Sequence, residues 1–168
     1  MSALNYANIE FMRLPEVDPT FIVDLMNEPD VRRHLPLAKG HFGPSDCEKF
    51  VSAKERFWKD HGYGPWAFML GDEFVGWGGL QPEGVDVDVG LVLHRKHWGA
   101  GRVLYRRIVD HAFRELQVPS VIVLLPPSRT RVAGISRLGF EEDGEVMIGE
   151  ERFVRYRLTS DRSTAGGG

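Results

Sequence analysis

The chain has 168 residues, 42% of them hydrophobic and 27% charged, which are ordinary values for one folded domain. Its formal net charge of −3 disfavours nucleic-acid binding, and no apolar run reaches the ~20 residues that a membrane-spanning helix requires. The single cysteine, Cys47, excludes an internal disulfide, and the N-terminus lacks the pattern of a signal peptide. We therefore expect a cytoplasmic protein without a nucleic-acid or membrane partner.

The first part of the chain is expected to form one strand and then helices. The strand is predicted over residues 8–14. Asp18 and Pro19 are a typical N-cap and first-turn pair, so a helix should begin there and end near Met26. Prolines interrupt the stretch 27–44, which predicts a short helical turn followed by a loop.

A longer helix and a pair of strands are expected next. Residues 45–48 have the pattern of a capping box, and the helix that they open should end near Asp60. The apolar stripe of this helix includes Cys47, which is therefore expected to be packed rather than nucleophilic. Two strands are predicted over residues 66–70 and 73–80, with a tight link between them.

The stretch 85–113 changes from a strand period to a helix period. Residues 85–93 alternate, with Asp86 and Asp88 on one face, as expected of a half-buried strand. From Ala100 onward, apolar residues recur at helical spacing; they are Leu104, Ile108, Val109, Ala112 and Leu116. The turn between these elements contains glycines and lies where the first N–H groups of the helix lack an internal acceptor. A helix start of this kind can bind an anion.

The last third of the chain predicts a strand, a short helix and a hairpin. Residues 120–125 form an apolar run between prolines, as expected of a strand covered on both faces. Ser128 is expected to cap the short helix, and Gly139 should end it. The hairpin is predicted from strands over residues 146–148 and 153–158.

The resulting order is β α α β β β α β α β β. It predicts an α+β fold with a mixed, mostly antiparallel sheet of about seven strands and about four helices. We expect a single domain over residues 1–160 and a flexible tail over residues 161–168.

The glycine turn reads KHWGAG over residues 96–101 and has three possible meanings as a phosphate loop. A dinucleotide-binding turn requires GxGxxG, but Leu104 stands in place of the third glycine. A Walker loop requires Gly-Lys-Ser/Thr, which the turn lacks. The third meaning is the pyrophosphate loop of an enzyme that uses acyl-CoA. The structural alternative is a plain turn with a solvated basic face, which we favour for Arg106 and Arg107.

Five short motifs follow one another along the chain. They are Trp66-Ala67-Phe68, Gly76-Trp77-Gly78-Gly79-Leu80, Asp88-Val89-Gly90-Leu91-Val92-Leu93, Trp98-Gly99-Ala100-Gly101 and Leu138-Gly139-Phe140. In order and spacing they resemble the motifs of the GNAT (general-control-related N-acetyltransferase) superfamily, and most closely those of its ribosomal-protein N-acetyltransferase-like (Rim-type) branch. The resemblance covers nearly the whole chain, although Lys96 replaces the Gln or Arg that begins the family's turn motif.

The resemblance implies how acetyl-CoA would bind. In the family, the main chain of the fourth strand pairs with the pantetheine arm, and N–H groups of the glycine turn hold the pyrophosphate. The 3′-phosphate would be reached by Lys96, Arg102, Arg106 or Arg131, although for Arg106 we favour the solvated basic face. The residues expected to bind the cosubstrate are Leu91, Val92, Leu93, Lys96, His97, Trp98, Gly99, Ala100, Gly101, Arg102, Ser128 and Arg131.

The resemblance also suggests a general base. Asp88 matches a position where Rim-type sequences often carry glutamate, and it would act through a water molecule because aspartate is shorter. The alternative is that Asp86 and Asp88 only line the polar face of a half-exposed strand.

The general acid departs from the family pattern. Many members carry a tyrosine where this chain has Ile135, and the usual Asn-x-x-Ser is replaced by Ser128-x-x-Arg131. Ser128 would cap a helix, contact the pantetheine, or do both. Tyr156 would reach the leaving thiolate or pack in the core.

We therefore predict an acetyl-CoA-dependent N-acetyltransferase, in which a primary amine attacks the thioester directly in a ternary complex. The acceptor would be a protein N-terminus or a small-molecule amine, with a homodimer left open. The alternatives are a non-catalytic acyl-CoA-binding module and, disfavoured by charge, a nucleic-acid-binding domain. A metal site is not expected, because His94 and His97 lack further ligands at metal spacing.

Overall fold

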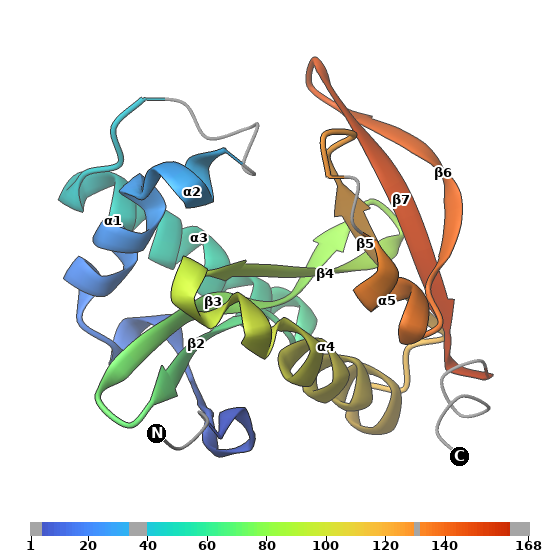
Figure 1. Cartoon of the computed structure of the whole chain (residues 1–168), viewed down its shortest axis with the longest axis horizontal. Helices are drawn as coiled ribbons and strands as arrows, with labels where there is room; N and C mark the ends of the chain where they lie inside the picture. The colour runs from blue at the N-terminus through green and yellow to red at the C-terminus, as the bar shows by residue number, and fades with distance from the viewer. Residues whose placement is uncertain (1–4, 34–39, 130–131, 162–168) are drawn as a thin grey trace. The chain divides into compact units, whose positions relative to one another are not determined.

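The computed structural model describes residues 5–33, 40–129 and 132–161 (Figure 1). Within them, seven strands form one mixed sheet, accompanied by five α-helices. The strand order across the sheet is β1 (Glu10–Met12), β2 (Pro65–Leu70), β3 (Glu73–Glu83), β4 (Asp86–Leu93), β5 (Ser120–Leu125), β7 (Glu151–Thr159) and β6 (Glu141–Ile148). The predicted α+β fold and the order of its elements are confirmed, and the expected short turn after residue 27 is itself a helix. Of the expected tail, residues 162–168 lie outside the described part of the chain.

Contacts within the chain divide it into two units. The first unit comprises Met1–Gly79 and Leu91–Val103, and the second comprises Leu80–Gly90 and Leu104–Gly168. The strands β3 (Glu73–Glu83) and β4 (Asp86–Leu93) each begin in one unit and end in the other. A single domain over residues 1–160 therefore stays a prediction.

The first strand, β1 (Glu10–Met12), is shorter than the predicted range because a 3-10 helix lies on each side of it. These are η1 (Tyr6–Asn8) and η2 (Leu14–Glu16), and the second contains a proline in its first turn, where no N–H group is needed. The strand pairs antiparallel with β2 (Pro65–Leu70).

Three helices follow, and the first begins as predicted. In α1 (Pro19–Asn27), the Asp18 carboxylate accepts a hydrogen bond from the Thr20 N–H at 3.0 Å, which satisfies one of the free donors at the helix start. The short helix α2 (Pro29–Arg32) follows almost directly, and Figure 1 shows both helices in blue.

The long helix α3 (Pro44–His61) begins earlier than its predicted capping box. Its N-cap is Gly43, whose N–H donates to Asp46 Oδ2 at 2.9 Å, so the prediction of a cap at residue 45 is wrong. The reason is Pro44, whose fixed φ and missing N–H favour the first helical position. The helix ends at Gly62, which adopts a left-handed φ of 77°.

The core of the first unit lies between these helices and the sheet. Its buried residues include Leu14, Ile22 and Leu25, which come from η2 and α1, and Phe74 from β3. Cys47 is 1% exposed in the same cluster, and burial raises the pKa of its thiol. The cysteine is therefore packed and protonated, as expected.

The predicted strand pair after α3 is confirmed as an antiparallel hairpin of β2 and β3. Gly71 turns the chain with a φ of 61°, which a residue with a side chain rarely adopts. The second strand continues to Glu83, beyond its predicted end at residue 80.

The glycine turn is a 3-10 helix, η3 (Arg95–Ala100), that leads directly into α4 (Gly101–Asp110). The predicted apolar stripe is buried at Leu104, Ile108 and Val109. A π-helical turn over His111–Glu115 follows. No helix in the described residues is long and apolar enough to cross a membrane.

The second unit is organised around β5 (Ser120–Leu125), which is buried on both faces as predicted. This strand runs parallel to β4, with Asp88 opposite Ile122, and antiparallel to β7 (Glu151–Thr159). The predicted hairpin is confirmed and is longer than expected, because β6 spans Glu141–Ile148.

The short helix α5 (Ala133–Arg137) is not capped by Ser128, so that prediction is wrong. Its N-cap is Val132, which makes no side-chain hydrogen bond to the helix. Ser128 instead lies in a turn closed by the hydrogen bond from the Arg129 N–H to the Pro126 carbonyl at 2.9 Å. The two prolines after β5 favour this turn and delay the helix.

Candidate active site

Asp88 is a buried carboxylate in the second unit. Asp88 lies on β4 and is only 7% exposed. Gln81 Nε2 donates a hydrogen bond to Asp88 Oδ2 at 3.0 Å. The prediction that this strand face is half-exposed is therefore wrong at Asp88. A charged group is seldom buried without a specific role or partner, and Gln81 fixes the direction of its oxygens.

Tyr105 is a second polar group of this region, and sequence reasoning missed it. Burial raises the pKa of Tyr105 to about 12; the nearby positive charge of Arg129 opposes that rise, and the negative charge of Asp88 adds to it. The phenol is therefore protonated at neutral pH and can donate a hydrogen bond. Helical periodicity placed Leu104 in the core but could not relate the next residue to a carboxylate on another element.

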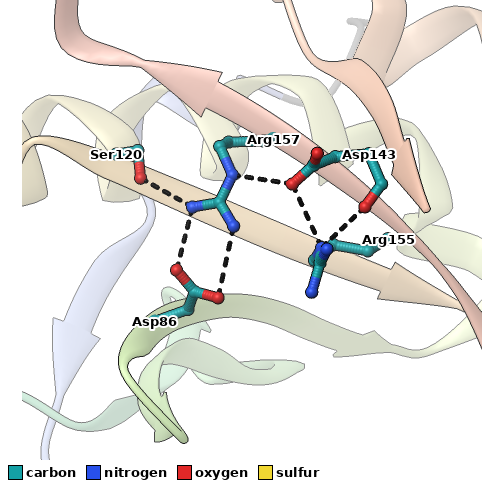
Figure 2. A network of polar contacts seen from close by, with 5 residues as sticks. All are labelled: Asp86, Ser120, Asp143, Arg155 and Arg157. Atoms are coloured by element: carbon teal, nitrogen blue, oxygen red, sulfur yellow. Dashed lines mark hydrogen bonds and ion pairs between the residues drawn. The ribbon is translucent and has the colours of Figure 1, made fainter. Parts of the chain in front are cut away.

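Asp86, the other acidic residue on this strand, belongs to a network of charges. Figure 2 shows its carboxylate facing the Arg157 guanidinium, whose Nη1 and Nη2 donate to the two carboxylate oxygens at 2.8 and 3.2 Å. Arg157 also donates to Ser120 at 2.9 Å and to Asp143 at 2.8 Å, and Asp143 accepts from Arg155. The hydrogen bonds from Arg157 lower the pKa of Asp86, so its charge is committed to this network.

Loss of this network is expected to lower stability in a pH-dependent way. Asp86→Asn should reduce the free energy of unfolding at pH 7 by about 1–3 kcal/mol, because Arg157 loses a charged partner. Folding lowers the pKa of Asp86. The contribution of Asp86 to the free energy of unfolding is therefore fully present above its pKa in the unfolded chain, about 3.9, and is lost as the pH falls through its lower pKa in the folded chain. Urea unfolding at pH 7 and at pH 3 should therefore show a smaller pH effect in the variant, and an equal effect would contradict this role.

The structure places Tyr156, one of the two predicted acid candidates, on the opposite face of the sheet from Asp88. Asp86 and Arg157 contact each other, so they share a face of the sheet, and alternation puts Asp88 on this face and Tyr156 on the opposite one. Ser128 is exposed in the turn after β5. Arg131, expected near the 3′-phosphate, lies outside the described residues.

In the first unit, the end of β4 and the turn after it carry the predicted donor residues. Leu91 and Val92 are half-buried, and Leu93 is buried. The Trp98 indole N–H donates to the Leu93 carbonyl at 3.1 Å.

The glycines of the turn have little internal reason to be glycine. Neither Gly99 nor Gly101 has a positive φ. A Cβ atom at Gly101 would meet nothing within 4 Å apart from its chain neighbours and the backbone of its own helix, and one at Gly99 would make an ordinary contact with Tyr6 at 3.8 Å. Ala100 is buried beneath them. Open space beside these residues allows a ligand to approach the backbone at the helix start.

The basic groups of the turn differ in their freedom to meet a phosphate. Lys96 forms an ion pair with Glu73, although its side chain is still 67% exposed. Arg102 is exposed. The His97 side chain is completely buried, so only its backbone can face a ligand. His94 pairs with Glu28 at 2.8 Å, and the described residues contain no group of three or more possible metal ligands.

The chain is similar to known proteins over most of its length. A family model described as an acetyltransferase (GNAT) domain matches residues 9–141. An acetyltransferase from Agrobacterium tumefaciens has a TM-score of 0.75 at 20% identity, with 95% of each chain covered. A spermidine N-acetyltransferase from Vibrio cholerae, solved in complex with CoA and spermine, has a TM-score of 0.75 at 15% identity; the match covers 94% of this chain and 99% of that one. A GNAT-family acetyltransferase from Bacillus anthracis has a TM-score of 0.74 at 16% identity, with 92% and 96% covered.

Proposed function

Because the chain belongs to the GNAT acetyltransferase family, whose members use acetyl-CoA, we propose that it transfers the acetyl group to a primary amine. Both substrates would be bound together, and no acetyl-enzyme would form. The observation that carries this proposal is Asp88, a buried carboxylate oriented by Gln81 on the strand that leads into the glycine turn. Placement within the Rim-type branch stays a prediction.

The donor would bind along the end of β4 and at the turn after it. Main-chain groups of Leu91 and Val92 would pair with the pantetheine arm, as another strand would. The backbone of residues 98–101 would hold the pyrophosphate, where the open space beside Gly101 supports a close approach. The Gly101 N–H itself donates to the Trp98 carbonyl within η3. Arg102 is exposed and adds positive charge at this helix start.

Asp88 would remove a proton from the acceptor through a water molecule, so that the amine nitrogen can attack the thioester carbon. The C–S bond then breaks and the CoA thiolate leaves, taking a proton from the acid form of Asp88 or from solvent. The carboxylate suits this task because it is buried and its Oδ2 is already fixed by Gln81, which limits reorganisation during proton transfer.

A cationic amine is the acceptor class that the observations favour. The chain carries a net charge of −3, and one similar structure is that of a spermidine N-acetyltransferase with spermine bound. A polyamine or another small alkylamine is therefore the first class to test, ahead of a protein N-terminus.

The test is to incubate the purified chain with acetyl-CoA and a panel of polyamines, alkylamines and N-terminal peptides, with detection of products by mass. An acetylated amine with stoichiometric release of CoA is expected. Binding of acetyl-CoA without any acetylated product would instead favour a non-catalytic acyl-CoA-binding module, an alternative that buried Ile135 supports because it stands where many family members have a tyrosine.

A further inference from the structure

His97 is a buried histidine inside the glycine turn. Its side chain is 0% exposed, and its backbone N–H donates to the His94 carbonyl at 2.8 Å, which helps to close η3. The ring is therefore enclosed by other residues, and its contacts can hold the turn in place.

Both ring nitrogens face groups from other elements of the first unit. Nδ1 lies 3.3 Å from the Tyr6 hydroxyl, which comes from η1, and Nε2 lies 3.4 Å from Glu73 Oε1 at the start of β3. The Tyr6 and His97 rings also meet edge to face, with centroids 5.8 Å apart. Two elements distant in sequence thus converge on one imidazole.

These contacts determine the form of the imidazole that fits. Nε2 lies near the Glu73 carboxylate, whose negative charge favours a proton on Nε2, although Nε2 makes no hydrogen bond within the described part of the chain. Nδ1 can then accept a hydrogen bond from the Tyr6 hydroxyl. The neutral ring with its proton on Nε2 therefore suits both the Tyr6 hydroxyl and the charge of Glu73. A second proton would fall on Nδ1 and turn the Tyr6 hydroxyl from donor to acceptor.

The same neighbours are joined to the rest of the turn. Glu73 also pairs with the Lys96 ammonium, so one carboxylate ties Lys96 to β3 and lies beside the ring of the next turn residue. On the other side, a Tyr6 ring carbon lies 3.8 Å from the Cβ position of Gly99. Tyr6 and Glu73 therefore hold the turn from two sides, and His97 lies between them.

We infer that neutral His97, bonded to Tyr6 and facing Glu73, is the positioning residue that holds the backbone of residues 98–101 in the shape that binds the pyrophosphate of acetyl-CoA. This inference rests on the proposed function, which gives that turn its ligand. His97 does not touch the ligand, because its side chain is buried. It acts by holding the backbone in the shape that binds.

The charges around the ring make this device sensitive to acid. Burial lowers the pKa of His97, and the positive charges of Lys96 and His94 lower it further. Glu73 is the negative group that faces the ring, and it is shared with Lys96. The ring is thus neutral at pH 7.5, and its protonation in acid would disturb the contact with Tyr6.

The test measures affinity for CoA by calorimetry between pH 5 and pH 8. Tyr6→Phe removes one hydroxyl and should weaken CoA binding about 3- to 10-fold at pH 7.5, the loss expected for one hydrogen bond. In this variant the KM for acetyl-CoA should rise as CoA binding weakens, whereas the KM for the amine should not change. A purely structural role would affect thermal stability without this separation of the two KM values.

His97→Gln provides the pH readout. Its affinity for CoA should be lower at pH 7.5 and should fall less steeply in acid than that of the wild type, because the titrating ring is gone. The 3′-phosphate of CoA titrates near pH ~6 as well, so the difference between the two proteins is the measured quantity. The control is His111→Gln, which changes a partly buried histidine of the second unit and should retain the wild-type profile.

The outcomes separate the two proposals. If the wild type does not bind CoA, the proposed function fails. If the wild type binds CoA, and Tyr6→Phe binds it equally well with the same pH profile, the inference about His97 is overturned while the proposed function stands. If His97→Gln does not fold, the result for Tyr6→Phe decides the inference by itself.

Discussion

Asp88→Asn is expected to lower the rate of acetyl transfer by about 10²- to 10⁴-fold, the range typical for loss of a general base. Asparagine keeps the size of the side chain and can still bond to Gln81, but it cannot take up a proton from the acceptor amine. The affinity for CoA should stay within about twofold of the wild type, because the proposed donor contacts lie at Leu91, Val92 and the turn. Single-turnover rates and calorimetry measure these two quantities.

The pH profile sharpens this prediction. If Asp88 is the base, the acid limb of the wild-type rate should be lost or moved in Asp88→Asn. Asp72→Asn is the matched control, since it removes the same charge from the exposed turn between β2 and β3 and should leave both the rate and its pH profile unchanged. An Asp88→Asn enzyme with wild-type rates at every pH would remove this carboxylate from the mechanism.

The fold was largely predictable because its signals are local. The strand period over residues 85–93, the helical period after Ala100 and the apolar run over 120–125 each correspond to an element of the structure. Errors arose at helix starts, where proline shifted a boundary. Pro44 moved the start of α3, and the proline pair before Ser128 delayed α5.

The candidate site was predictable only in part, because its side chains come from several elements. The sequence indicated Asp88 as the base, with the alternative that Asp86 and Asp88 only line a polar face. The structure gives Asp86 a different partner, Arg157, which comes from a strand near the end of the chain. It also gave no reason to link Tyr6 with His97, whose contact depends on the paths of the first 3-10 helix and the turn. Such long-range pairs carry no periodic signal that a single sequence can reveal.

The donor side of the site offers a sharper prediction, because affinity and stability should move independently. Gly101→Asp places a carboxylate in the first turn of α4, where the helix dipole stabilises negative charge, and its Cβ would meet nothing within 4 Å apart from its chain neighbours and the backbone of its own helix. The melting temperature should therefore be unchanged or slightly higher. Binding of CoA should nevertheless weaken by about 100-fold or more, because two like charges about 4 Å apart repel by several kcal/mol near a protein surface.

Gly101→Ala is the control that separates charge from size. Its methyl group enters the same open space without charge, so its CoA affinity should fall much less than that of Gly101→Asp. High salt screens exposed charges, so it should restore part of the CoA affinity that Gly101→Asp has lost. Gly101→Ala carries no added charge and should show no such recovery. If Gly101→Asp binds CoA as tightly as Gly101→Ala at low salt, the pyrophosphate does not lie at this helix start, whatever the activity of the enzyme. Since the aspartate variant is expected to stay folded, that result could not be attributed to loss of structure.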